Sequence, residues 1–203
     1  MKSVASRAGA FLLALLLIAV GWFGGLHESG NFHAVVPGEL YRSGQLSGPE
    51  LIRRIEQDGI RSVINLRGSQ TVTGWYDDER AATSAAGARH FDLRMSSVEH
   101  MDEAKARELV ALIDAAPKPV LIHCAGGADR TGLASALYLA AQGRRLDEAA
   151  GQLSARYGFV GIKGVTRPWP MWESWQRLAP VLAAEAQIAA GRAAGHGAAA
   201  PGS

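Results

Sequence analysis

The sequence is short of several features that would place it in a specialised class of protein. It has one cysteine in 203 residues, so an intrachain disulfide and a disulfide-stapled fold are excluded. Its 21 lysine and arginine residues nearly balance 19 aspartate and glutamate residues, which leaves no basic excess of the kind that nucleic-acid binding needs. Hydrophobic residues make up 48% of the chain and charged residues 20%, and this excludes a disordered chain or a collagen.

The histidines give no indication of a metal site. His33, His90 and His100 lack the spacing of metal ligands, and His196 lies near the C-terminus without a partner. We therefore expect neither a metal nor a cofactor.

One long hydrophobic run lies near the N-terminus. Residues 8–26 form 19 positions without a charge, close to the roughly 20 apolar residues that cross a bilayer as a helix. Because Lys2 and Arg7 precede the run, we expect the N-terminus in the cytoplasm and the rest of the chain in the periplasm or otherwise outside the cytoplasm. Residues 1–30 are thus predicted to be a single-pass membrane anchor. A cleaved secretory signal and a buried core helix are the alternatives.

The opposite end has an unusual composition. Residues 183–203 hold ten alanines and four glycines in 21 positions, too little apolar bulk to form a core. We expect the first part of this tail to prolong a helix and residues 191–203 to be disordered. Residues 31–182 then form one folded domain, since about 150 residues suffice for a single core.

Between the two ends, helical and extended patterns alternate. Residues 34–44 are predicted to form an entering strand and a turn, and runs of branched apolar residues predict strands at residues 61–68 and 118–123. Alternation of apolar and polar residues predicts a further strand at residues 88–95. Apolar stripes with helical spacing predict helices at residues 47–59, 73–87, 102–116, 132–143, 145–158 and 168–186. Strands that alternate with helices predict an α/β fold with a central, largely parallel sheet flanked by helices and preceded by one transmembrane helix.

The predicted helix at residues 73–87 starts with two aromatic residues and a charged run. We interpret the charged residues 77–80 as a solvated helix face. Trp75 is interpreted as a core residue, and the alternative is that Trp75 and Tyr76 form the wall of a binding pocket.

The strongest chemical signal is the segment HCAGGADRTG at residues 123–132. A buried strand ends at His123, a glycine-containing loop follows, and a helix begins near Arg130. Such an arrangement directs backbone N–H groups and a helix N-terminus at an anion. Cys124 opens the loop, where this setting favours the thiolate form of its side chain. Arg130 can grip a phosphoryl group with two parallel hydrogen bonds, and the hydroxyl of Thr131 is expected near the sulfur.

This segment resembles the signature of the protein tyrosine phosphatase superfamily, His-Cys-x5-Arg-Thr/Ser. Together with the segments LYRSGQL and VINLRG, it is similar to compact, dual-specificity-like bacterial phosphatases over roughly residues 31–180. The resemblance implies that Cys124 is the nucleophile that forms a phosphocysteine and that Arg130 clamps the transition state. It also implies that Thr131 assists departure of the thiolate and that His123 tunes the thiolate. The residues then expected to bind the phosphoryl group are Ala125, Gly126, Gly127, Ala128, Asp129 and Arg130.

The resemblance further implies a general acid on a separate loop, about 25–35 residues before the cysteine. Asp92, Glu99 and Asp102 are the candidates. Asp92 lies in a predicted strand, and Asp102 is explained as the N-terminal cap of the next helix. Glu99 lies in the loop between them without another evident role, so it is the favoured acid, although most relatives use aspartate.

The loop composition also bears on the substrate. The loop has no lysine, and an acidic Asp129 beside Arg130 should disfavour polyanionic lipid headgroups. We therefore expect a phosphatase that acts on phosphotyrosine or phosphoserine/threonine in proteins. Phosphatase action on non-protein phosphoesters, a membrane-tethered phosphoryl-binding module, a rhodanese-type sulfurtransferase and an inert cysteine are the alternatives. The expected partners are a phosphorylated protein and, through residues 8–26, a membrane.

Overall fold

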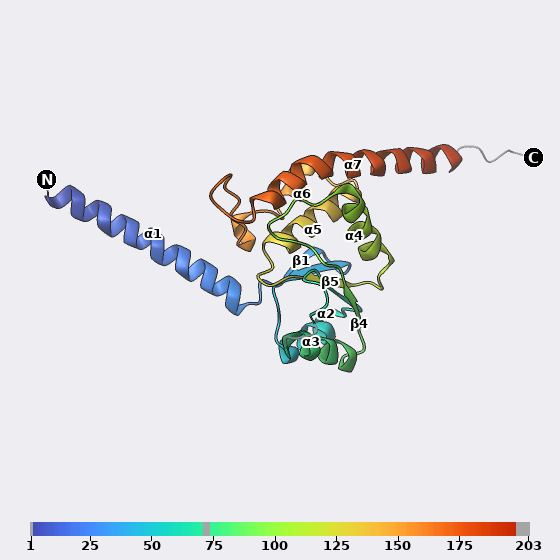
Figure 1. Ribbon diagram of the computed structural model, residues 1–203, viewed down its shortest axis with the longest axis horizontal. Coiled ribbons are helices and arrows are strands. Elements are labelled where there is room, and N and C mark those ends of the chain that lie inside the picture. Colours follow the sequence, from blue (N-terminus) through green and yellow to red (C-terminus); the bar gives the residue numbers. More distant parts are fainter. Residues whose placement is uncertain (1, 71–73, 198–203) are drawn as a thin grey trace, which may run out of the picture.

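The computed structural model describes residues 2–70 and 74–197 and confirms an α/β fold (Figure 1). Within these residues one sheet contains β1 (His33–Val36), β2 (Leu40–Ser43), β3 (Ser62–Asn65), β4 (Arg89–Asp92) and β5 (Val120–His123). The strand order is β1-β2-β5-β3-β4, and β1 is antiparallel to β2 while the other neighbours are parallel. The sheet is therefore mixed, with one antiparallel edge strand added to the expected parallel core.

Helices cover both faces of the sheet (Figure 1). The helices within the described residues are α1 (Lys2–Glu28), α2 (Gly48–Asp58), α3 (Gly74–Ala85), α4 (Glu103–Ala115), α5 (Asp129–Ala141), α6 (Leu146–Ala150), α7 (Trp169–Gly197) and the 3-10 helix η1 (Ala155–Tyr157), and α1 does not contribute to either face. On one face, Leu51 and Ile55 of α2 pack with Val63 and Leu121 of the strands. On the other face, residues of α4, α5 and α7 pack against Ile122 and its neighbours in the larger core.

Local signals set several helix ends where the sequence predicts them. The side chain of Ser47 caps α2 by accepting a hydrogen bond from the N–H of Glu50, and Gly59 ends the helix at a left-handed φ of 65°. Asp102 caps α4 by accepting from the N–H of Lys105. These short-range hydrogen bonds need no tertiary context, which is why the sequence alone could indicate them.

Three predicted elements differ from the structure. Residues 34–44, expected as an entering strand and a turn, contain a second strand as well: the chain turns at Gly38, which takes a left-handed φ of 74°, and β2 pairs back on β1 as a hairpin. Residues 145–158, expected as one helix, form α6 and η1, since α6 ends at Gly151. Residues 191–197, expected to be disordered, continue α7, consistent with the high helix propensity of alanine.

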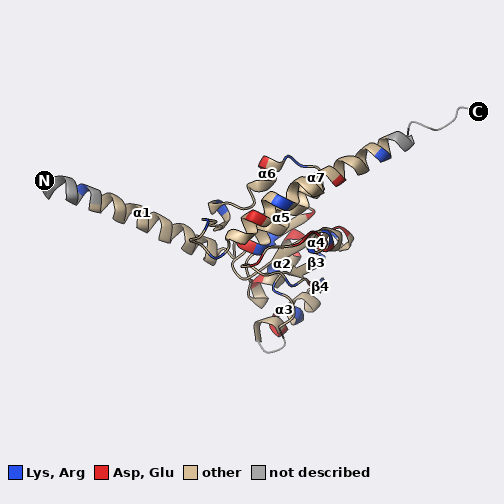
Figure 2. Cartoon of the chain, turned by 45° about the horizontal axis from the view of Figure 1, so that its top comes forward, with Lys and Arg blue, Asp and Glu red and all other residues tan. Residues whose placement is uncertain are grey.

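The N-terminal helix α1 projects away from the domain (Figure 1) and is almost free of charged residues (Figure 2). Its segment Gly9–Glu28 has a mean hydropathy of 2.2 and no part of it is buried, which excludes the buried core helix. Within the described residues this is the one helix long and apolar enough to cross a membrane, by criteria that a signal sequence also meets. Near its end, the indole N–H of Trp22 donates to the carbonyl of Ala155 at 3.1 Å.

The parallel strands end in register at one edge of the sheet. His123 at the end of β5 is aligned with Ser43 of β2 on one side and with Asn65 of β3 on the other. Asn65 is in turn aligned with Asp92 of β4. Ligands of open α/β sheets bind beyond the carboxyl ends of the strands, so the segments that follow these four residues frame the candidate site.

Candidate active site

Residues 124–128 form a tight loop between β5 and the N-terminus of α5. Gly127 adopts a left-handed φ of 71°, and a Cβ atom there would lie 2.5 Å from the backbone nitrogen of Gly44. Both the conformation and the close approach to the end of β2 therefore require glycine at this position. Gly126 has no such constraint from its surroundings, since a Cβ atom would meet nothing within 4 Å.

The carbonyl groups of the loop are held from outside. The N–H of Gln45 donates to Ala125, the side chain of Asn31 to Gly126 at 3.0 Å, and the guanidinium of Arg42 to Gly127 at 2.6 Å. In contrast, the N–H groups of residues 125–128 have no acceptor within the described part of the chain. Because the carbonyls point outward and the N–H groups stay free, the loop has the hydrogen-bonding pattern of an anion cradle.

Arg42 is a buried structural residue rather than part of the cradle itself. Its guanidinium also donates to the backbone and side-chain oxygens of Gln152 at 2.9 and 2.7 Å, and it stacks on the ring of Tyr157 at 3.9 Å. Burial lowers the pKa of Arg42 to about 10, which still leaves it charged at neutral pH. Arg42 thus ties β2, the loop and the segment after α6 together.

The helix that follows the loop supplies the remaining groups of the predicted signature. Cys124 is 2% exposed, and α5 begins at Asp129 without a side-chain cap. Arg130 lies in the first turn, and its buried Nε atom has no partner within the described residues. Thr131 is fully buried, with its hydroxyl 3.5 Å from the carbonyl of Ser43. The uncapped N-terminus of α5 and Arg130 add positive potential to the cradle.

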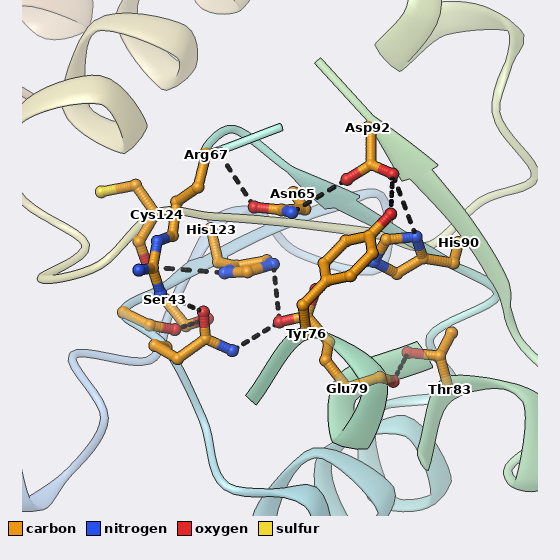
Figure 3. Close-up of polar contacts among 12 residues, drawn as sticks. Ser43, Asn65, Arg67, Tyr76, Glu79, Thr83, His90, Asp92, His123 and Cys124 are labelled. Carbon is orange, nitrogen blue, oxygen red and sulfur yellow. Dashed lines mark hydrogen bonds and ion pairs between the residues drawn. The ribbon is translucent and has the colours of Figure 1, made fainter. Parts of the chain in front are cut away.

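Behind the loop, His123 contacts a buried carboxylate that we did not predict (Figure 3). Its Nε2 atom lies 3.1 Å from Oε2 of Glu79, close enough for an ion pair but without the alignment of a hydrogen bond. Glu79 is 3% exposed and also contacts Nε2 of His90 at 2.8 Å and the amide of Gln45. Glu79 therefore joins His123, the residue before Cys124, to β4 and to the segment after β2.

The charged run at residues 77–80 is a solvated helix face at three of its four positions, and the interpretation is wrong for Glu79, which is buried. Tyr76, Glu79 and Thr83 lie on the buried side of α3, at the three- and four-residue spacing of one helical stripe. Because Glu79 shares this helical spacing with the apolar residues Tyr76 and Ala82, the sequence pattern could have indicated that its carboxylate faces the interior. Burial raises the pKa of Glu79, but His123, His90 and Gln45 outweigh this effect and lower the pKa to about 2.

This lowered pKa predicts how stability depends on pH. A carboxylate whose pKa falls from 4.5 to about 2 on folding stabilises the native state above pH 4.5, and this contribution is lost as the pH falls toward 2. Glu79→Gln should reduce the free energy of unfolding at pH 7 by about 3 kcal/mol. In urea titrations the gap from the wild type should close between pH 4.5 and 2. Glu56→Gln, an exposed change on α2, is the matched control, and a gap independent of pH would contradict this role.

A cavity of about 610 Å³ opens in front of the loop. Ala125 and Arg130 of the signature line it, together with Arg67 after β3, Arg94 after β4 and Glu99. Trp75 does not line the cavity itself, but it supports Arg67, whose guanidinium carbon lies 3.7 Å from the centroid of the Trp75 ring. The cavity is therefore rich in guanidinium groups from three different strand ends.

Asp129 does not line this cavity. It lines a neighbouring one of about 260 Å³, together with Ser97, Val98, Arg167 and Pro168. Burial raises the pKa of Asp129, and Arg130 acts in the opposite direction. The prediction that an acid beside Arg130 would repel a polyanionic substrate therefore loses its structural basis.

The three candidates for the general acid lie in different surroundings. Asp92 accepts hydrogen bonds from Asn65 at 2.9 Å and from Tyr76 at 2.5 Å, and it does not line the main cavity (Figure 3). Asp102 caps α4 as predicted. Glu99 is exposed and lines the main cavity, so it is the candidate that shares a space with Arg130.

Comparisons with known proteins identify the family of the chain. The sequence model of the tyrosine phosphatase family matches residues 23–150, more than half of the chain. No protein among the curated sequences matches significantly.

Several solved structures share the fold at low sequence identity. TpbA of P. aeruginosa is 21% identical, covers 79% of this chain and 92% of its own, and has a TM-score of 0.62. The catalytic core of the PP-IP phosphatase Siw14 from S. cerevisiae is 19% identical, with coverages of 73% and 85% and a TM-score of 0.60. PTPMT1 is 14% identical, with coverages of 77% and 99% and a TM-score of 0.59.

Proposed function

The chain belongs to the tyrosine phosphatase family, and from this premise we propose that it hydrolyses phosphomonoesters through a phosphocysteine intermediate on Cys124. The observation that carries the proposal is the loop after β5. Its N–H groups are free, its carbonyls are held from outside, and Cys124 and Arg130 stand at its two ends. Three equatorial phosphoryl oxygens match such a ring of donors, and the cradle also stabilises the charge of the transition state.

The proposed reaction has two steps. The thiolate of Cys124 attacks phosphorus while the bond to the leaving oxygen breaks, and the carboxylic acid of Glu99 gives that oxygen its proton. A water molecule then attacks the phosphocysteine, the Glu99 carboxylate takes a proton from this water, and the sulfur–phosphorus bond breaks. Inorganic phosphate leaves and the thiolate and the acid are restored. Throughout, Arg130 holds phosphoryl oxygens, and Thr131 and His123 support the thiolate.

This proposal is tested by turnover of a generic aryl phosphate. The full chain in detergent micelles should release p-nitrophenol from p-nitrophenyl phosphate, and a rapid acid quench should leave one phosphoryl group on the peptide that contains Cys124. Binding of phosphate compounds without release of the phenol would instead favour the module with little turnover. Transfer of sulfur from thiosulfate would favour a sulfurtransferase.

The role of Glu99 predicts a dependence on the leaving group. Glu99→Gln should slow an alkyl phosphate by about 100-fold or more, because its leaving oxygen needs a proton, while p-nitrophenyl phosphate should be slowed much less. Rates for both substrates across a pH series measure this difference, and the variant should lose the basic limb of the profile. Asp92→Asn is the matched control. If Glu99→Gln slows both substrates equally, or if Asp92→Asn slows the alkyl phosphate more than Glu99→Gln does, Glu99 is not the general acid.

We further propose that α1 anchors the chain in a membrane with residues 1–7 in the cytoplasm and the catalytic domain outside. The charge of Lys2 and Arg7 before the apolar segment supports this orientation. An alkaline phosphatase reporter at the C-terminus should be active in a bacterial host, and a green fluorescent reporter at the same place should stay dark. The reverse result would overturn the orientation, and a soluble form that starts near residue 27 would show a cleaved signal.

The anchor and the catalytic loop lie close together along the chain. Two residues separate the end of α1 from Asn31, whose side chain donates to the loop carbonyl of Gly126 and to the carbonyl of Tyr157. An anchored chain would therefore hold its cradle near the membrane surface.

Two substrate classes follow from these observations. TpbA has been solved with pTyr, and PTPMT1 with PI(5)P, so the shared fold is compatible with either a protein or a lipid phosphate. The absence of lysine from the loop is what remains in favour of a phosphorylated protein, since Asp129 lines another cavity. The arginine-rich cavity favours a non-protein phosphoester, and it also holds more positive charge than one phosphate needs.

A further inference from the structure

Two arginines in the main cavity lie outside the phosphatase signature. Arg67 follows β3 and Arg94 follows β4, and both line the cavity with Arg130. The free N–H groups of the loop and the fork of Arg130 already provide enough donors for one phosphoryl dianion. Arg67 and Arg94 are therefore surplus to a substrate with a single phosphate.

Arg67 is held in position by neutral neighbours. Its Nη1 atom donates to the side-chain oxygen of Gln45 at 3.0 Å, and its guanidinium carbon lies over the ring of Trp75, 3.7 Å from the ring centroid. The amide of Gln45 in turn donates to the buried Glu79 at 2.5 Å. This chain of contacts fixes the planar group in advance, while most of its donors remain available to a ligand.

Positive charge predominates among the residues that line the cavity. Burial and the charge of Arg130 lower the pKa of Arg67, while Cys124 and Glu79 raise it. Arg67 therefore interacts electrostatically with the residues at both ends of the loop, Cys124 and Arg130. Within the described residues neither Arg67 nor Arg94 forms an ion pair with a carboxylate. Glu99 is the one acidic residue among those that line the cavity, against three guanidinium groups. Unpaired cations that share a cavity repel one another, and a polyanion would relieve this repulsion.

We propose that Arg67 and Arg94 bind a second phosphoryl group of the substrate while the first lies on the Cys124 loop. The substrate class is then a small phosphorylated polyol with at least two phosphates, either free or as the headgroup of a membrane lipid. Two guanidinium groups match a phosphoryl dianion, whereas an acidic side chain beside a phosphorylated residue in a peptide carries a single charge. This inference rests on the proposed function, because it places the scissile phosphate on the same loop.

The test compares matched substrates in detergent-solubilised full chain. An inositol bisphosphate with phosphates on adjacent carbons should have a kcat/KM at least about tenfold above that of the inositol monophosphate that lacks one of them. Arg67→Gln and Arg94→Gln should each lower kcat/KM for the bisphosphate by about 10- to 100-fold, the effect of losing a charge-assisted hydrogen bond, and lower it less for the monophosphate. Arg67→Lys should recover only part of the loss. Arg89→Gln, an exposed change at the start of β4 outside the cavity, should leave both values unchanged.

Three outcomes would overturn the inference. One is equal kcat/KM for the two inositol phosphates, and another is an unchanged ratio in both glutamine variants. The third is preference for an acidic phosphotyrosine peptide that both glutamine variants reduce, which would assign the two arginines to a protein substrate. Turnover of a phosphatidylinositol bisphosphate in vesicles, compared with its free headgroup, identifies the source of the ligand, and faster turnover of either one than of the monophosphate supports the subsite.

The proposed second phosphate site can also be tested by binding, without catalysis. If the full chain does not hydrolyse p-nitrophenyl phosphate, the proposed function is wrong. Calorimetric titration with the inositol bisphosphate still tests the arginines in that case. Tighter binding of the bisphosphate than of the monophosphate, lost in Arg94→Gln but kept in Arg89→Gln, would support the second site without turnover, and equal binding of the two ligands would overturn it.

Discussion

Cys124→Ser is expected to reduce turnover of p-nitrophenyl phosphate to less than about a hundredth of the wild-type rate. Serine fills nearly the same space as cysteine, so the buried position at the end of β5 should keep its packing. Its hydroxyl is not ionised at neutral pH and no neighbouring base is assigned to activate it, so the attack on phosphorus fails. The expected loss is therefore in kcat, because the groups that bind phosphate are untouched.

Binding separates this outcome from unfolding. The variant should still bind inorganic phosphate through the loop N–H groups and Arg130, and its thermal midpoint should stay within a few degrees of the wild-type value. Arg89→Gln, an exposed change outside the cavity, is the control and should keep both the turnover and the thermal midpoint of the wild type. A serine variant that keeps more than a hundredth of the activity would exclude Cys124 as the nucleophile.

The core of the candidate site could be predicted because its residues are contiguous. The strand, the loop and the helix N-terminus all lie within residues 120–131, so local patterns indicate both the geometry and the chemistry. The caps at Ser47 and Asp102 were predictable for the same reason. In each case the relevant hydrogen bonds span only a few residues.

The groups that support the loop could not be predicted in this way. Arg42 reaches Gly127 and Gln152, and Asn31 reaches Gly126, across about a hundred residues of sequence. Glu79 is harder still, because a buried carboxylate is rare and is stable only where partners compensate its desolvation. Its partners His90 and His123 come from β4 and β5, and no spacing along the chain connects them.

The substrate prediction depended on strand order rather than on the loop. Asp129 follows the cradle in sequence but faces another cavity. Arg67 and Arg94 are distant in sequence from Arg130, yet they follow strands that the sheet order β5-β3-β4 places beside it. Since the order of parallel strands is a tertiary property, the charge of the cavity emerged only from the fold.

Arg130→Lys is expected to lower kcat by about a thousandfold while the fold is kept. The guanidinium can donate two parallel hydrogen bonds to phosphoryl oxygens whose charge grows in the transition state, and the ammonium of lysine offers a point charge without this fork. Loss of a preorganised donor of this kind costs about 100- to 1000-fold or more in kcat. The buried Nε atom, which has no partner within the described residues, fits a side chain whose remaining donors await a ligand.

The kinetic pattern distinguishes this role from simple attraction of substrate. If Arg130 acts mainly on the transition state, kcat and kcat/KM should fall together and KM should change little. Arg144→Lys, an exposed change just beyond the far end of α5, should leave both parameters unchanged. A rise in KM with kcat preserved would assign Arg130 to ground-state binding only, and a loss of less than tenfold would show that a single positive charge is all that the loop requires there.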